Sequence, residues 1–400
     1  MSPPPSARTG ALSDLRVIEL GQLIAGPFCG QMFADHGADV IKIEPPGEGD
    51  PIRTWGKGAI PVWWTVAGRN KRCVTVNLRT PEGRAIARRL IAQADVLIEN
   101  FRPGTLEKWG MGYEALAADN PRLVMVRVSG YGQTGPYAPR AGYASVGEAL
   151  GGMRHLCGEP DRPPSRAGLS LGDTLAASFA FMGALMALRE RERSGVGQVV
   201  DAAIYESVLA VTEALVPEYA VNGEIRGRSG SKLAGIAPSN VYPCADGDIL
   251  IAANQDSVFD RLCTAMARRD LATDPRFVGH RARGAHQDVL DEIIAAWTQP
   301  QSVAQVEALM VEHGVPAGRI YRAPDMLADP HYAARAAIVP VEAPGLPDLK
   351  MQNVFPKLSR TPGAVRWAGP ALGAHCADVF AELLGADEAQ IEAWREAGAI

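Results

Sequence analysis

The sequence predicts an α/β protein with a Rossmann-like, doubly wound large domain and a smaller α+β domain. In the N-terminal half, short aliphatic runs alternate with helical segments, which is the order of parallel βαβ units. The chain has 400 residues, whereas a usual domain has about 100 to 150 residues. Its 47% hydrophobic and 21% charged residues are a globular composition. We therefore expect at least two packing units.

The first predicted βαβ unit comprises a strand at 15–20, a helix at 27–36 and a strand at 38–43. Pro27 suits the first turn of its helix, where a backbone N–H is not needed. The later predicted elements of the large domain are a strand at 73–78, a helix at 81–94, strands at 96–99 and 123–129, a helix beginning at 148, a long helix from 173 to about 193, and a strand and helix within 199–213.

A loop rich in glycine, serine and basic residues at 226–235 marks the start of the smaller domain. A hairpin around Asp246-Gly247 and a largely helical stretch at 258–313 follow it. From 315 onward the pattern is rich in loops and ends in a helix near 377–384. The expected organisation is a disordered tail at 1–12, the first part of the large domain with a linker helix at 13–225, the small domain at 226–320, and a return linker with the C-terminal part of the large domain at 321–400.

Composition and charge argue against several classes of protein. The net charge is −5 without a long run of one sign, so neither a nucleic acid nor an anionic membrane is an expected partner. The longest apolar run, 174–188, is shorter than the ~18 residues that span a bilayer, so we expect a buried helix. The six cysteines and seven histidines lack the spacings of disulfide frameworks and zinc sites. We expect a cytoplasmic protein without a metal.

One glycine motif points to a dinucleotide site but lacks its context. Residues 130–135 (GYGQTG) match G-x-G-x-x-G after a predicted strand. A pyrophosphate site needs a helix to begin at this loop, and Pro136 and Pro139 interrupt that start. No acidic residue follows at the spacing expected for a ribose contact, ~20 residues on. We interpret the motif as a glycine-rich loop.

Asp173 follows Gly172 and opens the long apolar helix. Aspartate is a preferred helix N-cap, and this structural role is the one that the local pattern favours. The same position would also hold an ionised carboxylate as a nucleophile, because the N-terminal end of a helix is positive. The pattern alone leaves both roles open.

A set of short segments, in order along nearly the whole chain, resembles class III CoA-transferases, the family of formyl-CoA transferase and carnitine CoA-transferase. The segments are LGQLIAGP at 20–27, GADVIKIEP at 37–45, Gly49-Asp50, RNKR at 69–72, DVLIENFRPG at 95–104, SGYGQTGPY at 129–137, Gly142-Tyr143, Gly172-Asp173 and PALGAH at 370–375.

The resemblance implies that Asp173 is the nucleophile. Its carboxylate would attack a donor acyl-CoA to give an acyl-aspartyl anhydride, then an aspartyl-CoA thioester, and an acceptor acid would reverse these steps. Gly172 would leave backbone N–H groups available for the oxyanion. Coenzyme A is then a substrate, and neither ATP nor a tightly bound cofactor is needed. The resemblance also implies an interlocked homodimer.

The family's coenzyme cradle carries over to eight residues of this chain. Two of them, Lys71 and Arg72, would lie near the phosphates, although a solvated turn is the plain structural alternative. Ile24 and Ala144 depart from the family, which often has glutamine and an acidic residue there. The family's glycine-rich lid corresponds loosely to 229–235. The carried-over residues are Leu23, Ile24, Ala25, Lys71, Arg72, Asn100, Phe101 and Lys108.

Two rival functions share this framework. Racemases acting on α-methylacyl-CoA carry a histidine in the place of Tyr143, and a tyrosine with an ordinary pKa of about 10 is a poor partner in two-base proton transfer. A CoA-binding scaffold without catalysis is the second rival, against which the Gly172-Asp173 pair argues. The stretch around 147–164 resembles the branch that uses succinyl-CoA and dicarboxylates. One of Arg154, Arg162 and Arg166 would hold the far carboxylate, unless these are loop arginines in water.

Overall fold

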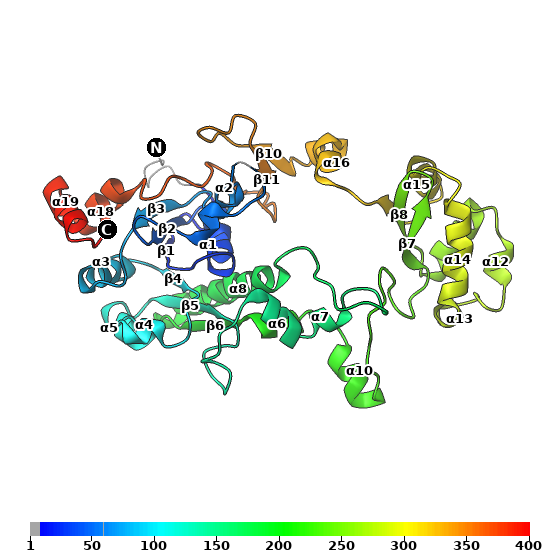
Figure 1. Ribbon diagram of the computed structural model, residues 1–400, viewed down its shortest axis with the longest axis horizontal. Coiled ribbons are helices and arrows are strands. Elements are labelled where there is room, and N and C mark those ends of the chain that lie inside the picture. The colour runs from blue at the N-terminus through cyan, green and yellow to red at the C-terminus, as the bar shows by residue number, and fades with distance from the viewer. Residues whose placement is uncertain (1–8, 59) are drawn as a thin grey trace. The chain divides into compact units, whose positions relative to one another are not determined.

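The computed structural model describes residues 9–58 and 60–400, which divide into two packed units (Figure 1). The large unit contains the residues up to Met153, Ala167–Pro217 and His331–Ile400. The small unit contains Arg154–Arg166 and Glu218–Pro330. We expected 226–320 for the small domain, so the packed unit is longer at both ends and gains the segment at 154–166.

A six-stranded parallel sheet forms the centre of the large unit, in the order β3-β2-β1-β4-β5-β6. The chain order reverses between β1 and β4, and ligands of open α/β sheets bind outside the carboxyl ends of the strands at such a switch point. The expected parallel sheet is confirmed. Its strands are β1 (Arg16–Glu19), β2 (Asp39–Glu44), β3 (Arg72–Thr75), β4 (Val96–Glu99), β5 (Val124–Ser129) and β6 (Val199–Ala203).

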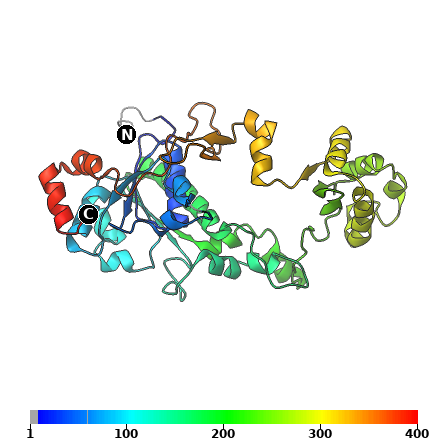
Figure 2. The same cartoon turned by 45° about the horizontal axis from the view of Figure 1, so that its top comes forward.

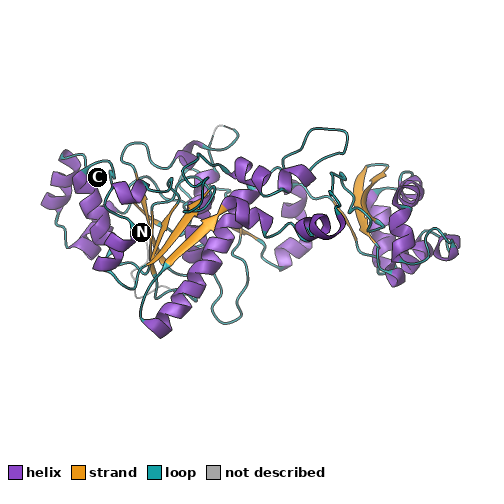
Figure 3. Ribbon diagram, turned by 90° about the horizontal axis from the view of Figure 1, so that it is seen from below, coloured by secondary structure: helices purple, strands orange, loops and turns teal. Residues whose placement is uncertain are grey.

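Helices cover both faces of this sheet (Figure 3). On one face, α1 and α8 lie side by side (Figure 2) and pack on strand residues such as Val17 and Val126. On the other face, α3, α18 and α19 pack on residues such as Ile18 and Leu97. The helices of this unit, including two that cross into the small unit, are α1 (Ala25–Asp35), α2 (Trp63–Ala67), α3 (Pro81–Ile91), α4 (Thr105–Lys108), α5 (Tyr113–Asp119), α6 (Ala144–Leu150), α7 (Met153–Leu156), α8 (Leu171–Ser194), α9 (Ile204–Leu209), α10 (Leu215–Asn222), α18 (Cys376–Leu384) and α19 (Glu388–Glu396), with a 3-10 helix at Pro51–Thr54.

Helix α8 is buried on one face and exposed on the other. Its alanines, among them Ala180 and Ala184, are fully buried and let the helix approach the sheet closely. Phe179, Met182 and Met186 are exposed on the opposite face. Within the described ranges it is the one helix long and apolar enough to cross a membrane. The expectation of a buried helix is therefore correct for only one of its faces.

Several predicted boundaries were wrong. The helix expected from 148 begins at Ala144, and the helix expected from Asp173 begins at Leu171 after the N-cap Ser170. Helix α19 and the short strands β10 (Ile338–Pro340) and β11 (Lys350–Gln352) were missed, because such short elements carry little periodicity. Of the tail predicted at 1–12, positions 1–8 lie outside the described residues. Leu12 donates its N–H to His36 O and packs on the core.

The small unit is built on an antiparallel sheet in the order β7-β8-β9, which includes the hairpin predicted around Asp246-Gly247. Residues such as Tyr242, Phe259 and Leu290 form its core. Its strands are β7 (Ser239–Cys244), β8 (Gly247–Ala252) and β9 (Ala317–Arg319), and its helices are α11 (Asp256–Ala265), α12 (Asp270–Thr273), α13 (His280–Ala285), α14 (Gln287–Thr298), α15 (Val303–Glu312) and α16 (Ala323–Ala328). Helix α17 (Pro330–Ala334) begins at its last residue and belongs otherwise to the large unit.

Candidate active site

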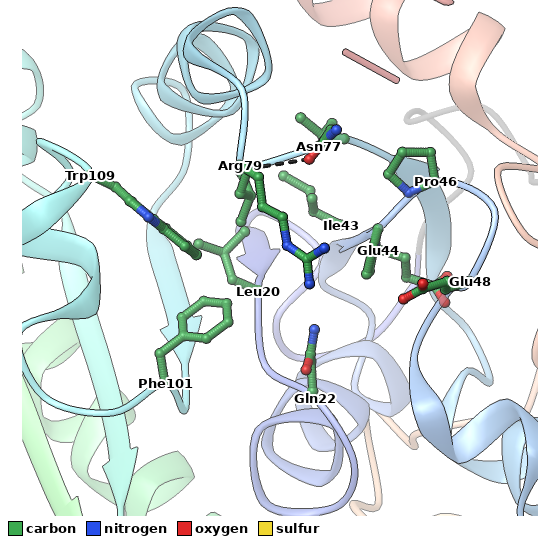
Figure 4. A pocket seen from close by; sticks show the side chains of 13 residues that line it. Leu20, Gln22, Ile43, Glu44, Pro46, Glu48, Asn77, Arg79, Phe101 and Trp109 are labelled. Carbon is green, nitrogen blue, oxygen red and sulfur yellow. Dashed lines mark hydrogen bonds between the residues drawn. The ribbon is translucent and has the colours of Figure 1, made fainter. Parts of the chain in front are cut away.

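A cavity of about 360 Å³ lies at the topological switch point of the large unit (Figure 4). It is formed by the loops that follow four parallel strands, which is the place where an α/β sheet binds its ligand. The lining residues are Leu20 and Gln22 after β1, Ile43, Glu44, Pro45, Pro46 and Glu48 at and after β2, Val76, Asn77, Leu78 and Arg79 after β3, and Phe101 and Trp109 after β4.

Arg79 supplies the cation of this cavity. Figure 4 shows its guanidinium group extending between the ring of Phe101 on one side and Pro46 on the other. Phe101 and Trp109 form an edge-to-face pair, with ring centroids 5.5 Å apart. An aromatic wall beside an exposed arginine suits a ligand that has a flat ring and phosphates. Arg79 was not among the residues predicted from the sequence, although it lies four positions after the end of β3, at the edge of the sheet where the other cradle segments lie.

The basic pair predicted near the phosphates lies elsewhere. Lys71 is fully buried, with its Nζ 2.7 Å from a carboxylate oxygen of Glu19, and it donates to Pro27 O. Arg72 is also buried and makes two hydrogen bonds to Asp39. These partners leave neither side chain facing the cavity. The alternative prediction for this pair, a solvated turn, is also wrong, because both side chains are buried.

The loop between β1 and α1, Gly21–Ile24, is held by side chains distant in the sequence. Asn100 accepts a hydrogen bond from Gln22 N at 2.8 Å and donates to Gln22 O at 2.9 Å. Asp50 accepts from Leu23 N at 3.0 Å. Both polar atoms of the Asn100 amide therefore bond to this loop, whereas we expected the residue to contact the coenzyme.

The remaining predicted cradle residues are distributed over three places. Leu23 and Ile24 line a second, apolar cavity of about 360 Å³ with Phe28 and Trp63, and Ala25 is buried at the start of α1. Phe101 lines the switch-point cavity and also packs on the core. Lys108 is exposed at the end of α4.

Glu99 anchors the loop that carries Phe101. Its buried carboxylate accepts from Phe101 N and from Arg127, each at 2.7 Å. Burial raises the pKa of Glu99 to about 7, and the nearby Arg127 opposes this shift. The position of the aromatic wall therefore depends on a carboxyl group that titrates near neutral pH.

Asp173 is half-buried in the first turn of α8, two positions after the helix begins, so it is not the N-cap that the sequence suggested. The positive end of the helix still favours its ionised form. Gly172 allows α6, α8 and α9 to meet, because a Cβ there would lie 3.1 Å from both Ala144 O and Ile204 Cγ2. We expected the N–H of Gly172 to be available for an oxyanion. It donates instead to Glu148 at 3.3 Å.

Tyr143 precedes α6 and is exposed. Because the carbonyl of Ala144 lies against Gly172, the structure brings the first turns of α6 and α8 together. Tyr143 directly precedes Ala144, and Asp173 directly follows Gly172. Because Ala144 and Gly172 are in contact, Tyr143 and Asp173 each lie next to this contact. The sequence predicted both members of this pair but not Glu148, whose burial could not be read from its pattern.

Arg154, Arg162 and Arg166 belong to the small unit, whereas Asp173 belongs to the large unit. Arg162 and Arg166 are exposed. Their loop packs on the segment that we expected to act as a lid, since Gly230 N donates to Gly158 O at 3.0 Å. The structure thus groups these arginines with the lid segment. Among residues 9–58 and 60–400, no cluster of three or more His, Cys, Asp or Glu side chains could hold a metal ion.

A parallel sheet with a cavity at its switch point is typical of α/β proteins that bind a ligand at the carboxyl ends of their strands. The chain belongs to CoA-transferase family III, whose model matches residues 12–376. It is therefore an enzyme of the CoA-transferase class, with CoA thioesters as substrates.

Similar proteins share almost the whole chain. A succinyl-CoA–D-citramalate CoA-transferase of Chloroflexus aurantiacus is 57% identical, over 94% of this chain and 95% of the relative. A succinate–glutarate CoA-transferase of Agrobacterium fabrum is 37% identical, over 94% and 96%. The crystal structure of a CAIB/BAIF family protein from Brucella suis has a TM-score of 0.84 at 36% identity, covering 94% of this chain and 100% of that one.

Proposed function

We propose that this enzyme transfers CoA from succinyl-CoA to a dicarboxylic acid through covalent intermediates on Asp173. The relatives named above act on succinyl-CoA or succinate together with a second diacid, which supports the substrate class. The observation that carries the mechanism is the half-buried carboxylate of Asp173 in the first turn of α8, beside the start of α6.

The proposed steps conserve the acyl energy of the thioester. An Asp173 oxygen attacks the succinyl carbonyl, the C–S bond breaks, and CoA leaves as the thiolate. The thiolate attacks the aspartyl carbonyl of the anhydride, and succinate leaves. A carboxylate of the acceptor then attacks the aspartyl-CoA thioester, the C–S bond breaks, and a new anhydride and the CoA thiolate form. The thiolate attacks the acceptor's acyl carbonyl in this anhydride, which releases the new acyl-CoA and restores the Asp173 carboxylate.

The switch-point cavity would hold the nucleotide part of the coenzyme. Phe101 and Trp109 provide an aromatic wall for the adenine ring, and Arg79 provides a cation for phosphate. Arg79 takes the role that we first gave to Lys71 and Arg72. Lys108 at the exposed end of α4 stays a proposed phosphate contact.

Three broader expectations remain part of the proposal. One is an interlocked homodimer, which would cover the exposed apolar face of α8 formed by Phe179, Met182 and Met186. A second is a cytoplasmic location. The third is a clamp on the far carboxylate of the diacid by one of Arg154, Arg162 and Arg166, with the segment 229–235 closing as a lid.

The test is a transfer assay with succinyl-CoA and a panel of acids, read by mass spectrometry. We expect CoA esters of dicarboxylates such as citramalate, malate or glutarate. Asp173→Asn should lower kcat by at least about a thousandfold, since it removes the nucleophile. The matched control is Glu82→Gln, because Glu82 is an exposed acid in the first turn of α3. Full turnover by Asp173→Asn would contradict the proposal.

The racemase alternative is tested in the same samples. Exchange of an α-proton of a 2-methylacyl-CoA with solvent deuterium, without transfer, would favour it. Binding of CoA without either reaction would favour the scaffold.

A further inference from the structure

The loop between β1 and α1 has a backbone conformation that its own sequence does not favour. Leu23 has a φ of 65°, in the left-handed region that side chains with a Cβ rarely adopt. Leu23 and Ile24 line one cavity and Gln22 lines the other, so the loop separates the two cavities. Something outside the loop must hold it in this conformation.

Three side chains, of which Lys42 and Asp50 are buried and Asn100 is partly buried, bind the backbone of three successive loop residues. Lys42 donates to Gly21 O, Asn100 bonds both backbone groups of Gln22, and Asp50 accepts from Leu23 N. Figure 4 shows Gln22 on the loop after β1, at the edge of the switch-point cavity. Lys42 lies in β2, Asn100 directly follows β4, and Asp50 directly precedes the 3-10 helix.

Asp50 and Lys42 belong to one buried ionic cluster. Lys42 Nζ lies 2.8 Å from Asp50 Oδ2 and 3.2 Å from Glu19, whose other oxygen pairs with Lys71 at 2.7 Å. Burial by itself would lower the pKa of Lys42, but Glu19 and Asp50 raise it. Burial opposes ionisation of Asp50, yet Lys42 and the amides of Ile52 and Leu23 lower its pKa. Both groups are therefore charged around neutral pH.

The helix that follows the loop makes room for this cluster. A Cβ on Gly30 of α1 would lie 1.8 Å from Glu19 Oε2, a distance that no Cβ tolerates. The glutamate thus lies where only glycine allows it, and it holds Lys42 against the loop.

We propose that Asp50, held by Lys42, is a positioning residue that fixes Leu23 and Ile24 for the CoA thioester before it binds. This inference rests on the proposed function, and it takes Leu23 and Ile24 to contact the coenzyme, as their resemblance to the family's coenzyme cradle implies. Fixing the loop in advance lowers the ordering cost of binding. Asp50 itself does not touch the reacting atoms.

The test uses the full-length protein and three variants. Asp50→Ala removes the acceptor of Leu23 N–H, whereas Asp50→Asn retains one acceptor oxygen. Asp39→Asn is the matched control, since Asp39 is equally buried and is bonded to two arginines, Arg16 and Arg72. Hydrogen exchange of the amides at 21–25 is measured without ligand, the Kd for CoA by calorimetry, and KM and kcat with succinyl-CoA.

We expect Asp50→Ala to speed exchange at Leu23 and to weaken CoA binding by about ten- to a hundredfold, as for a lost hydrogen bond to a charged group. KM should rise more than kcat falls. Asp50→Asn should give a smaller change in the same direction, and it serves as the folded variant if the alanine variant is unstable. Asp39→Asn should lower Tm without changing the exchange at Leu23 or the Kd.

Equal effects of Asp50→Asn and Asp39→Asn on Tm, with unchanged exchange at Leu23 and unchanged Kd, would overturn the inference. A wild type that binds CoA but transfers nothing would contradict the proposed function alone, and the Kd and exchange of the Asp50 variants would still decide the inference. A wild type that binds no CoA would overturn both.

Discussion

The proposed coenzyme loop (Gly21–Ile24) and the turn that carries the proposed nucleophile (Leu171–Asp173) are fixed by different physical means. Two buried charges, Lys42 and Asp50, and the partly buried amide of Asn100 bond the backbone of the loop. Close packing through Gly172 positions the turn, and one hydrogen bond to Glu148 orients it. The loop thus depends on the charges and hydrogen bonds of polar side chains, whereas the helix start depends mainly on close packing against Ala144 and Ile204. Substitutions should therefore affect the two regions differently.

The largest expected effect on stability is at Gly30, which makes room for the ions of the loop. Gly30→Ala would force a Cβ into Glu19 and displace its pairs with Lys42 and Lys71. We expect a loss of about 3 kcal/mol or more in the free energy of unfolding, as for overpacking combined with a broken buried pair.

Denaturant unfolding measures this loss. Gly227→Ala, with open space around its Cβ, is the control and should change stability by less than about 0.5 kcal/mol. A Gly30→Ala protein as stable as the wild type would mean that the ionic cluster is easily rearranged.

The next effect is a pH dependence that comes from Glu99, which holds the loop of Phe101. Its pKa is about 7 in the folded protein against an ordinary 4.5, so the folded state binds the proton more tightly than the unfolded state. The stabilising contribution is complete below about pH 4.5 and is lost as the pH rises through 7, with an upper bound of about 3 kcal/mol.

Unfolding of wild type and Glu99→Gln between pH 4.5 and 8 tests this contribution. Glu99→Gln should show a flatter profile, because the glutamine does not titrate. Parallel profiles would show that Arg127 keeps Glu99 ionised throughout this range.

Variants of Arg79 and Arg72 compare the exposed cation of the cavity with the buried basic pair, Lys71 and Arg72. Arg79→Ala should raise KM for succinyl-CoA by about ten- to a hundredfold and leave Tm nearly unchanged, since it removes a charged contact from an exposed side chain. Arg72→Ala should do the opposite, because it breaks buried bonds to Asp39. Steady-state kinetics and thermal melts separate the two, and an unchanged KM in Arg79→Ala would exclude Arg79 from phosphate binding.

The smallest expected effect is at the three arginines of the small unit. Single alanine variants of Arg154, Arg162 and Arg166 are assayed with glutarate against butyrate as acceptor. One of them should lower the preference for the diacid by about tenfold, as for a lost bidentate contact, and the other two should leave it unchanged. Unchanged preferences in all three would place diacid recognition elsewhere.

Local patterns predicted the large unit well because most of its strands are short, buried runs rich in aliphatic residues, as in β1, β4 and β5. Strand β4 occurs at 96–99 as predicted, and the G-x-G-x-x-G motif is followed by a loop. Asp173 and Tyr143 came from the family resemblance, and the structure places them at two packed helix starts. What failed was the assignment of individual side chains around the coenzyme loop.

That failure has a physical cause. Lys71 and Arg72 read as exposed because a basic pair usually is, and only the fold brings Glu19 and Asp39 to them. Asn100 bonds a residue 78 positions away, which no local pattern reveals. Arg79 was missed because its role depends on four strand ends that meet at one edge of the sheet.

The most direct test of the account is to trap the covalent intermediate on Asp173. Wild type is incubated with succinyl-CoA, treated with hydroxylamine and digested, and the modified residue is mapped by mass spectrometry. The account predicts a hydroxamate at Asp173 that depends on succinyl-CoA and is absent from Asp173→Asn. A turning-over enzyme with no modification at Asp173, or with the modification on another carboxylate such as Glu148, would contradict it.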